Sequence, residues 1–117
     1  MQLPRRMSMS RRHEFASVRK EGHSTACRYF LMATLLDPAI KDLKIGLITS
    51  RRVGNAVTRN KIRRRLRSII SKHGEKLQMS RYLVMVARHR AGEASFLQLE
   101  ADWLRLAQRL GILRDPS

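Results

Sequence analysis

The sequence predicts an α+β fold of two layers, and the distribution of its apolar residues is the basis for this prediction. Three segments, 25–36, 43–49 and 81–87, are rich in β-branched, aromatic and aliphatic residues, which is typical of strands. The segments around them have apolar residues at helical spacing. Helices and strands are therefore both expected to contribute to one core.

A short helix is expected over residues 11–20, with Ser10 as its N-cap and Gly22 at its end. Phe15 and Val18 are three residues apart and so lie on one face of this helix. Two roles remain open for Phe15: it either anchors the helix to the core or is available for binding.

The first two strand segments are expected to pair as a hairpin, because the turn-forming residues Asp37 and Pro38 separate segment 25–36 from segment 43–49. Apolar residues on both faces indicate that both faces of the sheet are at least partly covered. One face is assigned to the central helix and its neighbours. The other face is where a groove is expected.

Residues 50–70 are interpreted as a turn followed by a helix. Asn55 is placed to cap this helix, because its side chain can accept hydrogen bonds from the free amides of the first turn. Apolar residues at i, i+4, i+7 and i+8 then form one stripe that can face the core. This stripe consists of Ile62, Leu66, Ile69 and Ile70.

The other faces of the central helix are cationic, and no acid interrupts the series between Asp42 and Glu75. Each pair of like charges at i, i+4 destabilises a helix by about 0.2–0.5 kcal/mol, and Arg59 lies near the positive end of the helix dipole. An anionic partner offsets this repulsion, and guanidinium groups bind phosphate oxygens bidentately. The cations are Arg59, Lys61, Arg63, Arg64, Arg65 and Arg67.

After a helix stop at Gly74, segment 81–87 contains a continuous apolar run over 82–87, which is typical of an interior strand. The succession of strand, helix and strand predicts a parallel crossover, which is ordinarily right-handed. Ser95 is expected to cap a last helix that ends at Gly111. Its core-facing residues are Leu99, Trp103, Leu106 and Leu110.

The length of 117 residues is that of a single domain, assigned to residues 10–112 between a mobile basic arm over 1–9 and a tail over 113–117. The formal net charge of +16 indicates a polyanionic partner, first of all nucleic acid. A membrane surface is a weaker candidate, because the basic helix lacks the apolar face of interfacial helices. With Cys27 as the single cysteine and no signal-peptide or membrane-span pattern, we expect a cytoplasmic protein.

The chain carries no pattern typical of a protein nuclease, which needs a general base or carboxylates that converge on a metal ion. Its nine acids are scattered, and its four histidines lack ligand spacing. We therefore expect no metal or other cofactor on the protein itself, and we expect the chemistry to come from a partner.

The run from Gly54 to Arg64, Gly-Asn-Ala-Val-Thr-Arg-Asn-Lys-Ile-Arg-Arg, preceded by Arg51 and Arg52, closely resembles the signature of the bacterial ribonuclease P protein subunit. The order of elements over residues 9–110 fits the same family. The resemblance implies the order α-β-β-β-α-β-α with a rare left-handed crossover. It also implies a protein that assists a catalytic RNA in removing 5′ leaders from precursor tRNAs, with Mg²⁺ bound by the RNA activating the attacking water.

Two sets of site residues follow. The residues expected to contact RNA are Arg51, Arg52, Asn55, Arg59, Asn60, Lys61, Arg63, Arg64 and Arg67. By the resemblance, the open sheet face receives the single-stranded leader through Phe15, Arg19, Tyr29, Leu31, Ala33 and Ile48. The chain departs from the family pattern at Arg19 and Ala33, where aromatic residues are common. Arginine can stack on an unpaired base, whereas alanine cannot.

Two alternatives from other classes remain at this point. A structural or ribosomal RNA-binding protein shares the charge and fold but has no role in cleavage. A sequence-specific DNA-binding protein needs selective side chains on a recognition helix, and a nearly uniform arginine helix favours phosphate contacts over base readout. The sequence predicts no oligomeric state.

Overall fold

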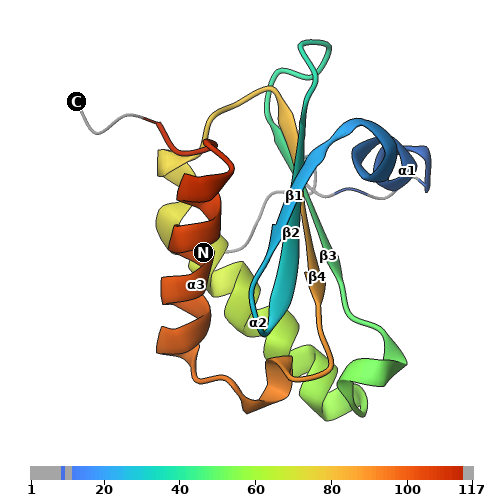
Figure 1. The fold of residues 1–117 in the computed structure, drawn as a ribbon, viewed down its shortest axis with the longest axis vertical. Coiled ribbons are helices and arrows are strands. Elements are labelled where there is room, and N and C mark those ends of the chain that lie inside the picture. The colour runs from blue at the N-terminus through green and yellow to red at the C-terminus, as the bar shows by residue number, and fades with distance from the viewer. Residues whose placement is uncertain (1–8, 10–11, 115–117) are drawn as a thin grey trace.

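The computed structural model of the protein describes Met9 and residues 12–114 (Figure 1). The order of elements is the predicted α-β-β-β-α-β-α, with short 3-10 turns between them. The elements are α1 (Arg12–Glu21), β1 (His23–Ala26), β2 (Phe30–Leu36), β3 (Leu43–Ile48), η2 (Arg51–Val53), α2 (Ala56–His73), η3 (Gly74–Lys76), β4 (Arg81–Ala87), η4 (Ala91–Glu93) and α3 (Phe96–Arg109).

The four strands form one sheet in the order β1-β2-β4-β3. β4 is the predicted interior strand: it pairs antiparallel with β2 and parallel with β3, with Leu47 opposite Met85. The parallel crossover through α2 is therefore confirmed, while its left hand stays an expectation from the family. An apolar strand suits this interior position because both of its faces are covered.

The predicted hairpin between segments 25–36 and 43–49 is wrong. The first segment contains a turn at residues 27–29 and forms a hairpin by itself, with β1 antiparallel to β2. β2 pairs on its other side with β4, which lies between it and β3. The turn residues after β2 thus lead to the far edge of the sheet instead of to a neighbouring strand.

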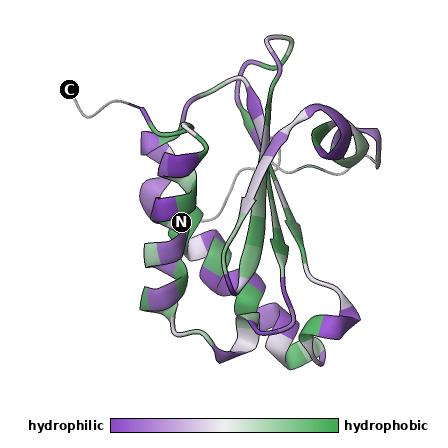
Figure 2. Cartoon of the chain, in the orientation of Figure 1, coloured by the Kyte–Doolittle hydropathy of each residue, from purple (hydrophilic) through white to green (hydrophobic). Residues whose placement is uncertain are grey.

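The sheet separates two unequal helical layers, as Figure 1 shows. α2 and α3 lie together on one face and enclose the main core, in which Trp103 is fully buried and donates from Nε1 to Met85 Sδ at 3.2 Å. α1 packs on the opposite face against β2 and β4. Figure 2 shows the hydrophobic residues of the strands between these layers.

The local signals of α2 and α3 are mostly confirmed. Asn55 caps α2 by accepting from the Thr58 amide at 2.9 Å, and the four residues of the apolar stripe are buried. Ser95 and Gln98 form a capping box at the start of α3. Gly74 differs from the prediction, because it has right-handed helical dihedrals and leads into η3 instead of reversing the chain.

The folded region extends beyond its predicted limits at both ends. Met9, assigned to the mobile arm, is buried and donates from its amide to Ile45 O at 2.9 Å. Leu113, assigned to the tail, forms a bridge with Leu77. The predicted cap Ser10 and the arm over 1–8 lie outside the described residues. Within residues 12–114 no helix has the length and apolar character needed to cross a membrane.

Candidate nucleic-acid interface

A groove of about 720 Å³ lies between α1 and the sheet, on the face opposite α2 and α3. α1, the glycine that follows it and all four strands contribute to its wall. Its lining residues are Phe15, Ala16, Val18, Arg19, Gly22, Ser24, Leu31, Ala33, Ile48, Val84 and Val86. The groove therefore has a mainly apolar wall with one cation, Arg19, at its α1 side.

Phe15 combines the two roles that the sequence left open. It packs against a small apolar cluster with Met9, Val18 and Val84, and it also lines the groove. Its ring lies directly on β3, because a Cβ atom placed on Gly46 would be 2.6 Å from Phe15 Cε1. The side chain is half-buried, so the rest of the ring faces the groove.

The structure brings five of the six predicted groove residues together, namely Phe15, Arg19, Leu31, Ala33 and Ile48. Tyr29 is the exception. It lies in the turn before β2 and packs against the main core on the side of α2 and α3. The alternation that places Leu31 in the groove begins only at Phe30, so it does not extend to Tyr29.

Six lining residues were not predicted, and two of them, Val84 and Val86, belong to β4. They lie opposite Ala33 and Leu31 in the register of β2 and β4, so the four side chains form the floor of the groove. They were missed because an uninterrupted apolar run, here over 82–87, does not show which residues face which layer. The neighbouring strand supplies that information.

A buried ion pair and a close backbone approach hold α1 in place. Lys44 Nζ lies 3.2 Å from Glu14 Oε2, and the Glu14 side chain is only 4% exposed. Gly22 follows the helix where a Cβ atom would lie 2.5 Å from Thr34 O, so only glycine allows this approach to β2. Burial, followed by the charge of Glu14, raises the pKa of the nearby Tyr82 hydroxyl.

The cationic residues of α2 divide into two groups. Lys61 and Arg65 contact the protein: Lys61 Nζ donates to Gly92 O at 3.5 Å and Arg65 Nη1 to Ala94 O at 2.7 Å. Arg64 and Arg67 are exposed, and their side chains make no ion pair or hydrogen bond within the described part of the chain. Lys61, one of the residues expected to contact RNA, thus contacts the η4 segment, as does Arg65, which is not among them.

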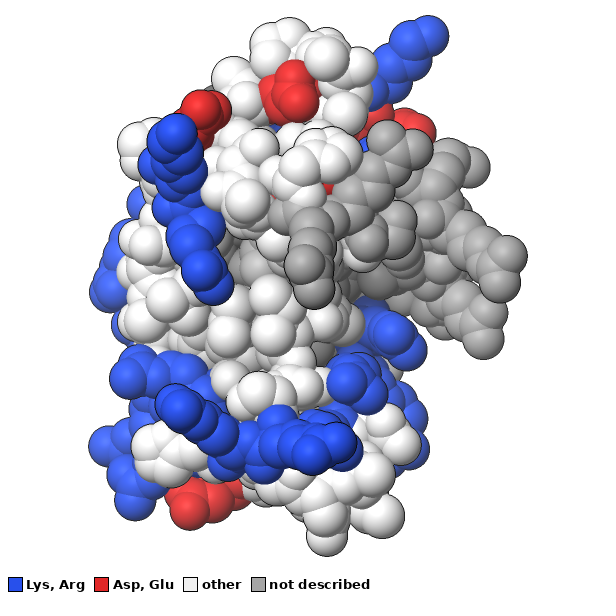
Figure 3. Space-filling view, turned by 90° about the vertical axis from the view of Figure 1, so that its right-hand side faces the viewer, with Lys and Arg blue, Asp and Glu red and all other residues white. Residues whose placement is uncertain are grey.

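The remaining predicted RNA-binding residues lie at the start of α2 and before it. Arg51 and Arg52 are exposed on η2, and Asn60 Oδ1 accepts from Arg63 Nη1 at 3.2 Å. Arg59 is half-buried and its Nε has no hydrogen-bond partner among the described residues. Figure 3 shows Lys and Arg side chains to the left, below and to the right of an uncharged central area on the face that carries α1.

Potential metal ligands are dispersed over the described part of the chain. No three His, Cys, Asp or Glu side chains of residues 12–114 come together in a way that could hold a metal ion.

Comparison with known proteins places these features in a family context. The model of the family described as Ribonuclease P matches residues 3–111. The Ribonuclease P protein component of Bacillus pumilus is 35% identical over 110 residues, covering 94% of this chain and 92% of the relative. The protein of the same name from Bacillus velezensis is 30% identical over 115 residues, covering 98% of each chain.

Solved structures agree with the fold. The Staphylococcus aureus RNase P protein has a TM-score of 0.85 and 26% sequence identity, with 92% of this chain and 98% of that chain covered. The Thermotoga maritima RNase P protein, 24% identical, has a TM-score of 0.77 over 87% of this chain and 96% of its own. At 24% identity, the similarity to the Thermotoga maritima protein supports a shared fold and nothing more.

Proposed function

The chain belongs to the ribonuclease P protein family, and on that premise we propose that its groove and its cationic helix are two separate RNA contacts. The protein component of this endoribonuclease works with an RNA subunit in tRNA processing. The cationic surface of η2 and α2 binds the RNA subunit, and the groove holds the single-stranded 5′ leader of precursor tRNA.

The contacts of α2 support its role as a phosphate-binding surface. Exposed guanidinium groups such as Arg64 and Arg67 have no carboxylate partner among the described residues. The net charge of +16 provides the long-range attraction to a polyanion. Phosphate contacts position a protein on RNA without reading the base sequence. A subunit that binds one folded RNA needs contacts of this kind.

The groove carries the proposal for the leader, and its composition is the decisive observation. Its floor and walls are apolar, its volume is about 720 Å³, and an aromatic ring at Phe15 borders it. Unpaired bases are held by stacking on aromatic or guanidinium planes and by apolar contact, while a duplex is too wide for such a groove. Arg19 offers the second plane, and Ala33 contributes a small apolar side chain to the wall.

In this proposal Mg²⁺ would be held by the RNA subunit, and when bound it would supply the activation of water for hydrolysis of the leader. The described residues of the protein bring no ligand set together, so no step is assigned to them. The protein instead positions the substrate and screens phosphate repulsion between two RNAs. We place this assembly in the cytoplasm, where precursor tRNAs of bacteria are made.

Substitution of Phe15 tests the groove. Phe15→Ala should weaken holoenzyme binding of precursor tRNA with a leader by about 1–3 kcal/mol, the worth of one stacked base, and leave mature tRNA binding unchanged. Leu97→Ala is the matched control, because Leu97 is a 72% exposed apolar residue on α3 outside the groove. Equal losses for both RNAs would mean that Phe15 acts only through stability.

The rival function, RNA binding without a role in cleavage, requires a separate measurement. Reconstitution with a bacterial ribonuclease P RNA at low Mg²⁺ should show faster cleavage of precursor tRNA when the protein is present. An unchanged cleavage rate would favour the rival.

Arg19→Phe should keep or strengthen leader binding, and a loss of leader affinity in this variant would show that the charge of Arg19 contacts a leader phosphate.

A further inference from the structure

A second hollow, of about 360 Å³, lies on the other side of the molecule from the groove, between α3 and the turn that joins β1 to β2. Two loop residues and four residues of α3 line it. They are Arg28, Tyr29, Gln98, Ala101, Asp102 and Arg105. Tyr29, which the sequence assigned to the leader groove, is the aromatic residue of this hollow.

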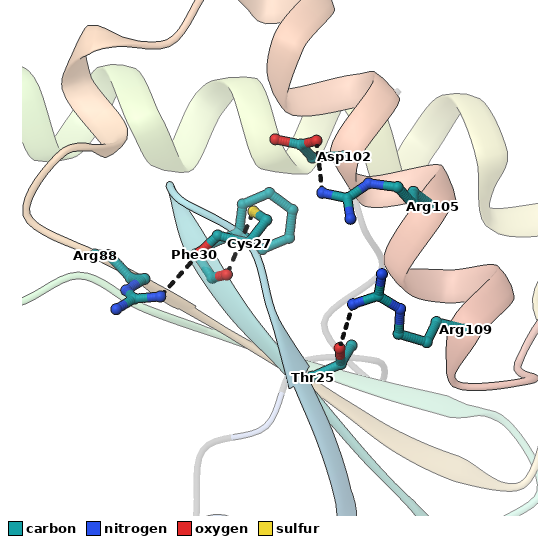
Figure 4. Close-up of polar contacts among 7 residues, drawn as sticks. All are labelled: Thr25, Cys27, Phe30, Arg88, Asp102, Arg105 and Arg109. Atoms are coloured by element: carbon teal, nitrogen blue, oxygen red, sulfur yellow. Dashed lines mark hydrogen bonds and ion pairs between the residues drawn. The ribbon is translucent and has the colours of Figure 1, made fainter.

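Contacts between strand and helix side chains hold the turn beside α3, as Figure 4 shows. Arg88 Nη1 donates to Cys27 O at 3.0 Å, and Arg109 Nη1 donates to Thr25 Oγ1 at 3.3 Å. The Cys27 thiol donates to Phe30 O at 3.4 Å behind the turn. The hollow is therefore a fixed feature of the packing and does not depend on a free loop.

The lining of the hollow carries a net positive charge, because it contains two arginines and one carboxylate. Asp102 Oδ1 accepts from Arg105 Nη2 at 3.0 Å, and this pair is half-exposed. Arg28 is exposed at the turn and has no ion-pair partner among the described residues. The guanidinium group of Arg28 therefore favours an anionic ligand.

The groups inside the hollow are those that hold a planar heterocycle. Tyr29 is half-buried and offers a ring, and Asp102 offers a carboxylate that accepts hydrogen bonds. Gln98 Oε1 already accepts from the Ser95 amide at 2.8 Å, so the NH₂ of this side chain is the group left to donate. A donor and an acceptor beside an aromatic ring match the edge and the face of a nucleobase.

We propose that this hollow binds one unpaired nucleotide of a single-stranded RNA, with the base against Tyr29 and the flanking phosphate on Arg28. The site is separate from the leader groove and from α2. A volume of about 360 Å³ admits a single base, and the unpaired guanidinium group of Arg28 suits a phosphate next to it. An acidic peptide would satisfy the charge but would make no use of the ring and the paired donor and acceptor.

Photocrosslinking of the protein tests the proposed site, because it identifies the residues that contact the RNA and not only how tightly the RNA binds. A short oligocytidylate that carries 5-iodocytidine is irradiated with the protein, and the crosslinked peptide is identified by mass spectrometry. The crosslink is expected at Tyr29. Tyr29→Leu, which keeps apolar packing but removes the ring, should reduce the yield at this hollow by about fivefold to a hundredfold, while Tyr29→Phe should keep it.

Arg28→Glu is the second variant, because this exposed turn residue can be changed without disturbing the core. It should lower the yield by about threefold to tenfold through the lost phosphate contact. Lys41→Glu is the charge-matched control on the exposed loop between β2 and β3 and should leave the yield unchanged. Arg63→Ala on α2 should also leave the crosslink at this hollow in place, so a failure of the proposed α2 contact would be seen separately.

Three results would overturn the proposal. They are crosslinks that map only to α1 or α2, an effect of Lys41→Glu equal to that of Arg28→Glu, and displacement of the oligonucleotide by polyglutamate as readily as by unlabelled oligocytidylate. The last result would identify an unspecific anion surface.

Discussion

Gly46 determines where the ring of Phe15 can lie. A methyl group at this position would be 2.6 Å from Phe15 Cε1 and 3.1 Å from Met9 Sδ, so both side chains would have to move. Gly46→Ala should lower the free energy of unfolding by about 1–3 kcal/mol, the usual effect of overpacking. It should also weaken precursor tRNA binding more than mature tRNA binding, because the displaced ring borders the groove.

Gly74→Ala is the matched control for that experiment. Gly74 has right-handed helical dihedrals, and a methyl group at this position would meet no other atom within 4 Å. The substitution should leave RNA binding unchanged and raise the free energy of unfolding by about 0.4–1 kcal/mol, because alanine restricts the unfolded chain. Chemical denaturation measures both variants, and a stable Gly46→Ala protein with full leader affinity would contradict the assigned position of the ring.

The alternation of side chains along a strand predicted the groove residues correctly wherever the strand is regular. Leu31 and Ala33 were placed correctly because β2 alternates from Phe30 onward. Tyr29 was misplaced because the turn before β2 ends the alternation, and neither Cys27 nor Arg28 is a residue type that marks a turn. Side-chain direction in a turn depends on tertiary contacts, which a periodic pattern does not contain.

At the scale of elements, the arginines of α2 have two different roles. Two residues that are adjacent in the sequence can differ in role. Arg64 is exposed without a protein partner among the described residues, whereas Arg65 donates to Ala94 O at 2.7 Å. Arg64→Ala should leave the melting temperature unchanged and make the slope of log affinity against log salt shallower by about 0.7–0.9.

Arg65→Ala should show the opposite pattern. It should lower the free energy of unfolding by about 1–2 kcal/mol, because a charge-assisted hydrogen bond to η4 is lost, and change the salt slope little. Binding titrations over a range of KCl concentrations, together with thermal melts, measure both variants. Equal salt slopes for wild type and Arg64→Ala would show that this residue does not contact phosphate.

A polar cluster joins α2 to α3 and makes their packing sensitive to acid. Lys72 Nζ and His73 Nε2 lie 2.8 Å and 3.0 Å from Glu100 Oε2, and the His73 ring stacks on Trp103. Hydrogen bonds from Lys72 and then from His73 lower the pKa of Glu100 below its ordinary value of 4.5. The stabilisation is therefore complete above pH 4.5 and is lost as the pH falls through the lowered pKa.

Urea denaturation of wild type and Glu100→Gln between neutral pH and about pH 3 tests this link. The difference in unfolding free energy between the two proteins should be largest at neutral pH and should shrink below pH 4.5, the ordinary value for the glutamate. The other acids titrate in both proteins, so their effect cancels in the difference. A difference that stays constant over this range would rule out the ionised Glu100 as the stabilising group.

Elements were predicted more reliably than their pairing. The caps Asn55 and Ser95 and the apolar stripe of α2 depend on local chemistry, and all are present as expected. The hairpin between β2 and β3 failed because the segment after α2, far along the chain, supplies the strand that separates them. Turn residues such as Asp37 and Pro38 indicate only that the chain reverses locally. They do not show that a strand many residues later will lie between β2 and β3.

For the whole molecule, the net charge of +16 on 117 residues opposes folding through self-repulsion. Salt screens this repulsion, since the Debye length falls from about 10 Å at 0.1 M to about 3 Å at 1 M. The melting temperature of the isolated protein should therefore rise with NaCl, by roughly 3–6 °C for each 1 kcal/mol gained. A melting temperature that falls with salt would show that attractive ion pairs outweigh the repulsion.

The same salt should weaken RNA binding while it stabilises the free protein. With about five neutralised phosphates, log affinity should fall against log salt with a slope of roughly −3.5 to −4.5. Fluorescence titration with the RNA subunit measures this slope, and a value near zero would exclude the cationic surface as the binding site.

The position of β4 in the sheet has a consequence for synthesis of the protein. β4 is the last strand to leave the ribosome, yet it joins β2 to β3, so until then both of these strands have an unpaired edge. Nascent chains that end before Arg81 should therefore stay sensitive to protease, and protection should appear in one step after β4 has emerged. The order of strands thus delays folding until most of the chain has been translated.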